Sequence, residues 1–390
     1  MALTRADREW MVQRARALGF DLADVTSVPE PASAAAAEGD RRYTQWIDAG
    51  HAGEMEYLKR ADDAGEYLRG DLRRSIPWAR SVIVCAVNYD ADAPRSIDPA
   101  DPGAGWIARY AWSGREDASD ALGKGSDYHD VLLLRLRSLE AELTARFGES
   151  SQLSSDGLQM RCYVDTGPLM ERGYAVRAGI GWIGKNTCVI HQQQGSWLLL
   201  GVIVTSLELA PDAWSVPAAD RCGSCTRCID ACPTSALIEP EPGGVRAMDA
   251  TRCIAYLTIE KKGNIAEELR PLMGRQVFGC DICQDVCPWN RKAPVAASSM
   301  LPPRQELVNP ALEWLAAMDG PAFNRTFRGS PLERTRRKRI LRNVAIAMGN
   351  SGVLDYLPQL DAWAVGDDAV LAEAASWAAA HLRGSSATIS

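Results

Sequence analysis

Eight of the 11 cysteines in this 390-residue chain follow spacings that suit iron–sulfur clusters. One run reads C-x2-C-x2-C-x3-C, a later run reads C-x2-C-x3-C, and proline follows the last cysteine of each. Thiolates at three-residue intervals can wrap one face of a cubane, and in two-cluster bacterial ferredoxins the last cysteine of a run ligates the other cluster. The spacing therefore predicts two [4Fe–4S] clusters that exchange ligands. We expect one cluster on Cys222, Cys225, Cys228 and Cys287, and the other on Cys232, Cys253, Cys280 and Cys283.

The alternatives for these cysteines are a zinc site or simple burial in a core. Zinc knuckles usually pair C-x2-C units and mix in histidine, whereas both runs here end in Cys-Pro. Disulfides are not expected, because no export signal is visible and a reducing compartment is the default. We interpret the remaining thiols, Cys85, Cys162 and Cys188, as packed side chains.

Asp165 is the candidate acid, because it directly follows a predicted strand and opens a glycine-rich segment over residues 165–188. Glycines in that segment allow close backbone approach to a ligand. Its offsets do not match the G-x-G-x-x-G nucleotide fingerprint, and no Walker motif is present. A general acid must hold its proton before it reacts, and burial in a cofactor cavity would favour the protonated form. The alternative is a capping role for a helix that begins near Pro168.

A basic window over residues 325–350 contrasts with the acidic chain. It holds eight basic residues and one acid, a charge of +7, so the rest of the chain carries −14 and the total is −7. Such asymmetry indicates a polyanionic partner, with Arg336, Arg337 and Lys338 as candidate phosphate contacts. The alternative is a solvated helix face.

Hydrophobic periodicity places these residues on a succession of helices and strands. It predicts helices over 4–18, 128–147, 169–178, 332–348, 353–364 and 369–382, and buried strands over 81–87, 160–164 and 197–205. No apolar run approaches the ~18 residues of a membrane span. Residues 1–20 carry charges throughout and lack the apolar stretch of a secretory signal, so the cytoplasm is the expected location and no membrane is expected as a partner.

Three segments carry a family resemblance. They read YVDTGPLMERGYAVRAGIGWIGKN, CGSCTRCIDACPTSAL and FGCDICQDVCPWN. On these segments, and in its basic helical C-terminus, the chain resembles the epoxyqueuosine reductases over residues 6–382. A plain ferredoxin would share the cysteine runs but not the DTGP…GIGWIGKN segment.

The resemblance implies a cobalamin-dependent oxidoreductase that reduces epoxyqueuosine to queuosine at the wobble position of tRNA, the last step of queuosine biosynthesis. We therefore expect an α+β protein with three parts. These are an N-terminal α/β cobalamin-binding catalytic domain over 1–215, a two-cluster ferredoxin-like module over 216–300, and an α-helical HEAT-like repeat domain over 301–390 that contacts the anticodon stem-loop. An external electron donor such as flavodoxin or ferredoxin is implied, and the family favours a monomer.

Site residues follow from the same resemblance. Asp165 matches the proton donor, and Lys261 and Lys262 match a tRNA-facing stretch. Cobalamin contacts are expected at Arg69, Ala108, Asp165, Met170, Gly184, Asn186, Val189, Leu200, Asp281 and Ile282.

The chain departs from the family in two places. An insert over 113–126 separates Trp112 from the Asp127-Tyr128-His129 triplet, and Ala108 offers no side-chain ligand to cobalt. We interpret His129 as a surface histidine at a helix N-terminus. Two other classes stay open: a reductive dehalogenase-like corrinoid enzyme and a ferredoxin-type electron carrier.

Overall fold

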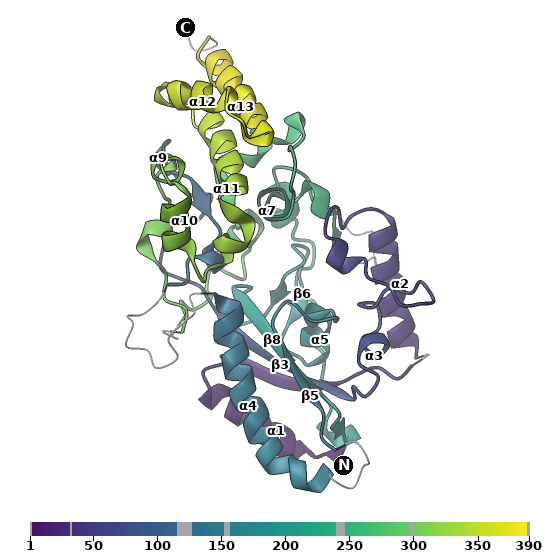
Figure 1. The fold of residues 1–390 in the computed structure, drawn as a ribbon. Helices are drawn as coiled ribbons and strands as arrows, with labels where there is room; N and C mark the ends of the chain where they lie inside the picture. Colours follow the sequence, from purple (N-terminus) through teal and green to yellow (C-terminus); the bar gives the residue numbers. More distant parts are fainter. Residues whose placement is uncertain are drawn as a thin grey trace.

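The computed structural model describes residues 2–31, 33–114, 127–151, 157–238, 246–296 and 300–387. A four-stranded sheet organises the N-terminal half, in the order β2–β3–β8–β5 (Figure 1). The strands are β2 (Leu22–Ser27), β3 (Ser81–Asn88), β5 (Met160–Tyr163) and β8 (Leu198–Thr205). The predicted alternation of helices and strands is present, but every pair in this sheet is antiparallel.

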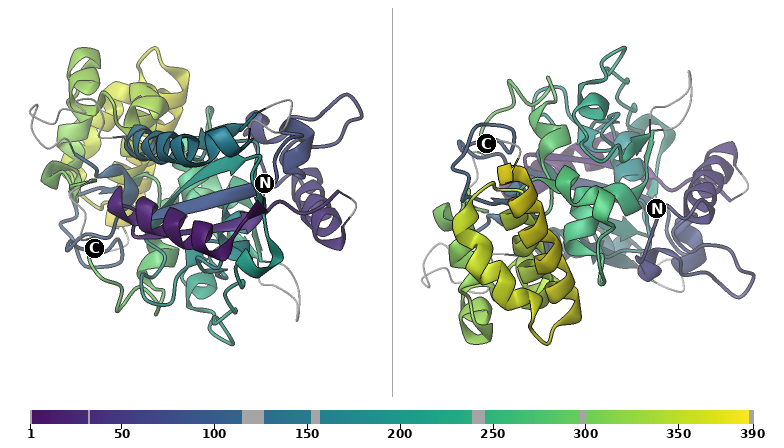
Figure 2. Two further views of the ribbon diagram at one scale, coloured as in Figure 1. Left: turned by 90° about the horizontal axis from the view of Figure 1, so that it is seen from below. Right: turned by 90° about the horizontal axis from the view of Figure 1, so that it is seen from above.

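Helices cover both faces of the sheet, which explains why all eight residues of β3 are buried. One face packs against α1 (Arg5–Ala17) and α4 (Tyr128–Ser151), which cross it side by side (Figure 2, left). The other face packs against α5 (Glu171–Arg177). A strand covered on both faces reads as a continuous apolar run, and this is how the sequence signals it.

The predicted elements of the N-terminal half are confirmed with shifts of one to four residues. Helix α1 starts at the predicted cap, because Thr4 accepts from the Asp7 main-chain N–H while the Asp7 carboxylate accepts from the Thr4 N–H. Strand β2 and helix α2 (Ala34–Asp48) were not predicted from the sequence. The expected insert over 113–126 lies outside the described residues from 115 onward.

The cluster module and the C-terminal helices share one hydrophobic core. The helices are α9 (Leu312–Ala316), α10 (Gly320–Phe327), α11 (Pro331–Gly349), α12 (Leu357–Ala364) and α13 (Ala369–Ala387). The last three match the predicted ranges and lie at the end of the molecule opposite the N-terminus (Figures 1 and 2). Helix α11 is broken at Arg336, whose φ of 62° is left-handed.

The remaining helices and strands are short. The helices are α3 (Leu72–Ser75), α6 (Arg227–Asp230), α7 (Ile254–Ile259) and α8 (Ile282–Asp285). The strands are β1 (Ala2–Leu3), β4 (Trp106–Ile107), β6 (Trp182–Ile183), β7 (Val189–Ile190), β9 (Glu208–Leu209), β10 (Leu237–Ile238), β11 (Ala247–Met248) and β12 (Gln276–Phe278). Among the described helices, none has both the length and the apolar character required to cross a bilayer.

Candidate functional site

The structure brings the eight motif cysteines together in two groups. Cys222, Cys225, Cys228 and Cys287 line one pocket. The second group is Cys232, Cys253, Cys280 and Cys283. Burial chiefly raises the pKa of Cys280, and the nearby Cys253 and Cys232 add to the effect. A hydrogen bond with Cys188 chiefly raises the pKa of Cys283, and Cys280 and Cys253 add to that effect.

The first group, which we call the outer cysteine group, opens to a cavity of about 620 Å³ that exposed side chains also line. Burial raises the pKa of Cys228 and Cys287 to about 11, and it raises the pKa of Cys280 in the second group well above the ordinary thiol value. Cys188 also lies against the second group, where a hydrogen bond with Cys283 lowers its pKa. Within the described residues, no three His, Cys, Asp or Glu side chains are arranged to hold a single metal ion.

Asp165 occupies a loop rather than a helix cap. Helix α5 begins at Glu171, six residues further on, so the capping interpretation is wrong. The backbone of Asp165 has a left-handed φ of 59°, a conformation that aspartate tolerates better than most residues. Its main-chain N–H donates to the Glu171 carboxyl at 2.8 Å, which fixes the turn, and its own carboxyl is 69% exposed.

The Asp165 carboxyl faces the start of α4. The Tyr128 hydroxyl donates to it at 3.3 Å, and the His129 Nε2 lies 3.8 Å from the same oxygen. The His129 side chain is only 15% exposed, so its interpretation as a surface histidine is wrong. Its Nδ1 lies 2.8 Å from the Asp127 carboxylate. The segment after the insert therefore supplies two side chains directed at the candidate acid.

Arg334 joins this network from the C-terminal helices. Its guanidinium pairs with Asp127 at 3.0 Å and lies 3.0 Å from the His129 Nδ1. Burial alone would raise the pKa of Asp127, but hydrogen bonds from His129 and the charge of Arg334 outweigh it and lower that pKa. Asp127 is thus held as a carboxylate between His129 and the Arg334 guanidinium. This role of Arg334 was not predicted from the sequence, where its only signal was membership of the basic window.

A second carboxyl and an arginine lie on the other side of Asp165. Burial raises the pKa of Glu171 to about 8, and the negative charge of Asp165 adds to the effect. Arg69 opposes that shift and lies 5.9 Å from the centre of the Tyr57 ring. The structure therefore brings the predicted Arg69 and Asp165 together, along with Glu171 and Tyr57, which the sequence did not single out.

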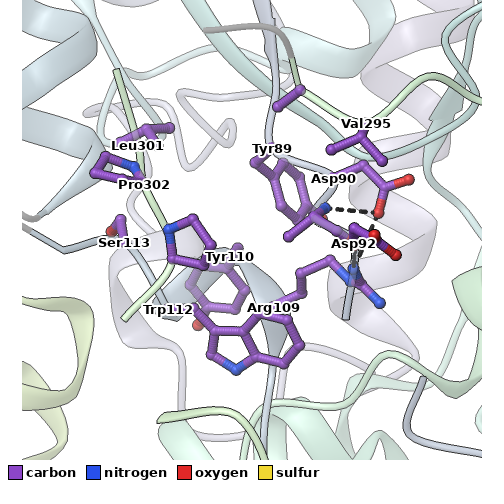
Figure 3. A pocket seen from close by; sticks show the side chains of 13 residues that line it. Tyr89, Asp90, Asp92, Arg109, Tyr110, Trp112, Ser113, Val295, Leu301 and Pro302 are labelled. Atoms are coloured by element: carbon purple, nitrogen blue, oxygen red, sulfur yellow. Dashed lines mark hydrogen bonds and ion pairs between the residues drawn. The ribbon is translucent and has the colours of Figure 1, made fainter. Parts of the chain in front are cut away.

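Ala108 and Asp281 are adjacent, as expected for residues of one site. The main-chain N–H of Arg109 donates to the Asp281 carboxylate at 2.7 Å, and burial raises the pKa of Asp281 to about 7. The Arg109 side chain is buried, pairs with Asp90 at 3.0 Å and lies against Trp112. It borders a cavity of about 250 Å³ that Tyr89 and Trp112 also line (Figure 3). Arg109 thus anchors the segment that carries Ala108.

The other predicted cofactor contacts lie around these residues. Asn186 is buried, accepts from the Cys188 N–H at 3.2 Å and donates to the Cys283 carbonyl at 3.4 Å, which ties its loop to the second cysteine group. A Cβ atom at Gly184 would overlap the Ile190 Cδ1 and lie 2.6 Å from the Asn186 Oδ1, so a larger residue there would displace these side chains. The remaining contacts lie at the start of α5, in β7, in β8 and in α8; they are Met170, Val189, Leu200 and Ile282.

The loop that carries Lys261 and Lys262 packs against α11, the helix of the basic window. Arg339 of α11 donates to the Ile259 and Glu260 carbonyls, and Arg342 donates to the Lys261 carbonyl at 2.8 Å. Lys261 also pairs with Glu54, while Lys262 is exposed.

Within the basic window, exposure differs from residue to residue. Arg336 and Lys338 are exposed, and Lys338 pairs with Asp368 at 3.1 Å. Arg337 donates to the Met318 carbonyl at 2.6 Å, and Arg342 is buried. The window's charge is therefore only partly available to a partner.

Comparisons with known proteins point to one family over most of the chain. The family model for epoxyqueuosine reductase QueG (DUF1730) matches residues 69–166, and a model for a 4Fe-4S double cluster binding domain matches residues 221–290. The epoxyqueuosine reductase of Xanthomonas campestris pv. campestris is 35% identical over 370 residues, which cover 94% of each chain.

Solved structures agree as well. An epoxyqueuosine reductase in complex with an epoxyqueuosine-modified tRNA-Tyr stem loop superposes with a TM-score of 0.76 at 28% identity, covering 96% of this chain and 89% of that one. The Bacillus subtilis enzyme, with its catalytic aspartate loop swung out of the active site, gives 0.76 at 28% identity over 96% and 90% of the two chains. By sequence and by fold, the chain belongs to the epoxyqueuosine reductase family.

Proposed function

We propose that this chain reduces epoxyqueuosine to queuosine at the wobble position of tRNA, with cobalamin and two [4Fe–4S] clusters as its cofactors. The observation that carries the proposal is the alignment to the Xanthomonas campestris epoxyqueuosine reductase, which covers 94% of both chains at 35% identity. The same chain also holds the candidate acid and the two cysteine groups. A ferredoxin-type carrier would account for residues 221–290 alone. A dehalogenase would leave the basic helices unexplained.

The residues predicted to contact cobalamin suit that group chemically. Most are apolar or small, which fits a broad macrocycle, and Arg69 and Asn186 can bind its polar edge. We propose that the cofactor lies between these residues, with Ala108 and Asp281 on the side of the second cysteine group. When bound, cobalamin supplies a low-valent cobalt able to reduce the substrate, and the clusters supply single electrons to it.

Asp165 supplies a proton in this proposal. Removal of the epoxide oxygen as water consumes two electrons and two protons, and the opening oxygen needs one proton as its C–O bond breaks. We assign to the loop that carries Asp165 the role of the catalytic aspartate loop named for the related Bacillus subtilis enzyme. Tyr128 and His129 orient the carboxyl by the contacts described above, and Asp127 and Arg334 hold His129 in turn.

The helices α11–α13 form the proposed HEAT-like unit that holds the anticodon stem-loop. Support comes from the complex of the related enzyme with a modified tRNA stem loop and from the exposed Arg336, Lys338 and Lys262. Because Arg334 extends from α11 to Asp127, the same helix would reach both RNA and the candidate acid. We also propose a monomer that works in the cytoplasm and receives electrons from flavodoxin or ferredoxin.

The test is an anaerobic assay with reconstituted protein, cobalamin and an epoxyqueuosine-containing stem-loop. Mass spectrometry should show loss of one oxygen from the nucleoside, and the optical spectrum should show both clusters and a bound corrinoid. Turnover without cobalamin would contradict the proposal. Dehalogenation of an aryl halide in place of epoxide reduction would favour the dehalogenase alternative.

A further inference from the structure

The pocket over the outer cysteine group carries a concentration of positive charge. It encloses about 620 Å³, and its described lining contains four basic side chains and no acidic one. We name these four residues the basic rim: Lys185, Arg221, Arg227 and Lys292. They come from three loops and from the start of α6, so the fold, rather than one charged stretch, brings them together. A group of four basic residues around one pocket is unexpected in a chain whose net charge is −7.

Most of the charge of the basic rim is exposed. Arg221, Arg227 and Lys292 are exposed, and no member of the rim forms an ion pair with any described residue. Of the nearby acids, Asp220 pairs with Arg246 and also feels the charge of Lys185, and Asp230 accepts from the Thr226 hydroxyl at 2.8 Å. The rim is therefore available to an anionic partner.

We infer that the basic rim is the docking site for an acidic one-electron carrier protein, which delivers electrons to the cluster held by the outer cysteines. The inference rests on the proposed function, since it assigns the entry point for that reaction's electrons. Each docking event would oxidise the carrier by one electron and reduce the cluster by one, and two events would supply one turnover. No bond is formed or broken at this site.

Two observations favour a redox carrier over RNA as the occupant. The rim lines the same pocket as the outer cysteine group, so a partner bound there lies next to that cluster site. The predicted RNA contacts lie instead on α11 and the loop after α7. Complexes between electron-transfer proteins are small and transient, and complementary charge chiefly raises their rate of association. A rim of four unpaired cations matches that kind of encounter.

The test compares two double variants of the cofactor-loaded protein. Arg221→Gln/Arg227→Gln removes two charges from the rim, and Arg16→Gln/Arg137→Gln removes two exposed charges from α1 and α4 as the matched control. Reduced flavodoxin is one electron donor, and titanium(III) citrate is the other. Cluster reduction is followed by stopped-flow absorbance without substrate, and flavodoxin binding by anisotropy between about 50 and about 300 mM NaCl.

We expect the rim variant to accept electrons from flavodoxin at least ~10-fold more slowly, with a flatter dependence on salt. The control variant and all titanium(III) rates should stay at the wild-type level. Equal flavodoxin kinetics in the wild type and the rim variant would overturn the inference. So would a rim variant that loses stem-loop affinity alone, or one that is slowed equally with titanium(III). If the wild type takes up electrons but leaves epoxyqueuosine intact, the proposed function fails instead.

Discussion

At the scale of single residues, the position of Asp165 leads to the sharpest prediction. Asp165→Asn keeps the size of the side chain and its acceptor for Tyr128, but it removes the transferable proton. General acid catalysis contributes about 10²–10⁴-fold in rate, so turnover of the epoxyqueuosine stem-loop should fall by that factor. Cluster content, corrinoid binding and stem-loop affinity should not change, and single-turnover mass spectrometry measures the loss. Near-wild-type turnover would mean that another group delivers the proton.

Glu171 leads to a prediction about pH. The pKa of this carboxyl is raised to about 8 in the folded protein, so the folded state binds more protons than the unfolded state between its ordinary value and about 8. Its contribution to stability is complete at low pH and is lost as pH rises through about 8. Glu171→Gln cannot ionise and keeps an acceptor for the Asp165 N–H. The melting temperature of cluster-loaded protein should therefore fall less between about pH 6 and about pH 9 in the variant than in the wild type. Parallel curves would contradict the burial of an ionisable Glu171.

The sequence identified some of these residues and missed others for a physical reason. Asp165 was recognisable from its place between a strand and a glycine-rich segment. His129 and Arg334 were not, because their roles depend on a contact between residues 205 positions apart, and no local pattern encodes it. Periodicity describes what one element buries, whereas a site depends on which side chains several elements direct to the same point.

At the scale of elements, α11 is held by two buried polar side chains. Asn343 donates to the Thr258 and Val277 carbonyls at 2.8 Å each, and the Arg342 guanidinium donates to three further carbonyls in α7 and the loop that follows it. Burial lowers the pKa of Arg342 to about 10. These contacts join the helical region to the cluster module at one seam. The sequence predicted a helix over 332–348 that includes both residues, but it did not predict their burial. A charged residue such as Arg342 is normally expected to be exposed.

We expect a single substitution in this seam to lower the stability of the protein strongly. Asn343→Ala leaves two buried carbonyls without donors, so the free energy of unfolding should fall by about 2–4 kcal/mol in anaerobic urea titrations. Gln359→Ala, at an exposed position on α12, is the matched control and should stay within about 0.5 kcal/mol of the wild type. Equal stabilities for the two variants would show that the seam is not tightly packed in solution.

At the scale of the whole molecule, the sequence located the cysteines better than it located the surface charge. Ligand spacing predicted that the distant Cys287 meets Cys222, Cys225 and Cys228, and all four line one pocket. The +7 window is different, because counting charges ignores burial. Arg342 is internal, Arg339 binds main-chain carbonyls, and Arg334 belongs to the Asp127 network. The charge that remains for RNA lies at the exposed Arg325, Arg328, Arg336 and Lys338.

The last prediction concerns the exposed residues of the basic window. An acidic chain attracts tRNA only where positive charge is exposed, and phosphate contacts are additive and sensitive to salt. Lys338 is 83% exposed, and Arg336 lies at the break in α11, which turns its side chain out of the regular helix. Arg336→Gln/Lys338→Gln should weaken binding of the anticodon stem-loop and flatten its log–log salt dependence by about 0.7–0.9 for each phosphate that is no longer neutralised. Cluster content should be unchanged, because both residues lie outside the cysteine groups. Arg16→Gln/Arg137→Gln alters charge equally and should leave the slope unaltered. If both pairs behave alike, the stem-loop is held elsewhere, and Lys262 on the adjacent loop is the next residue to replace.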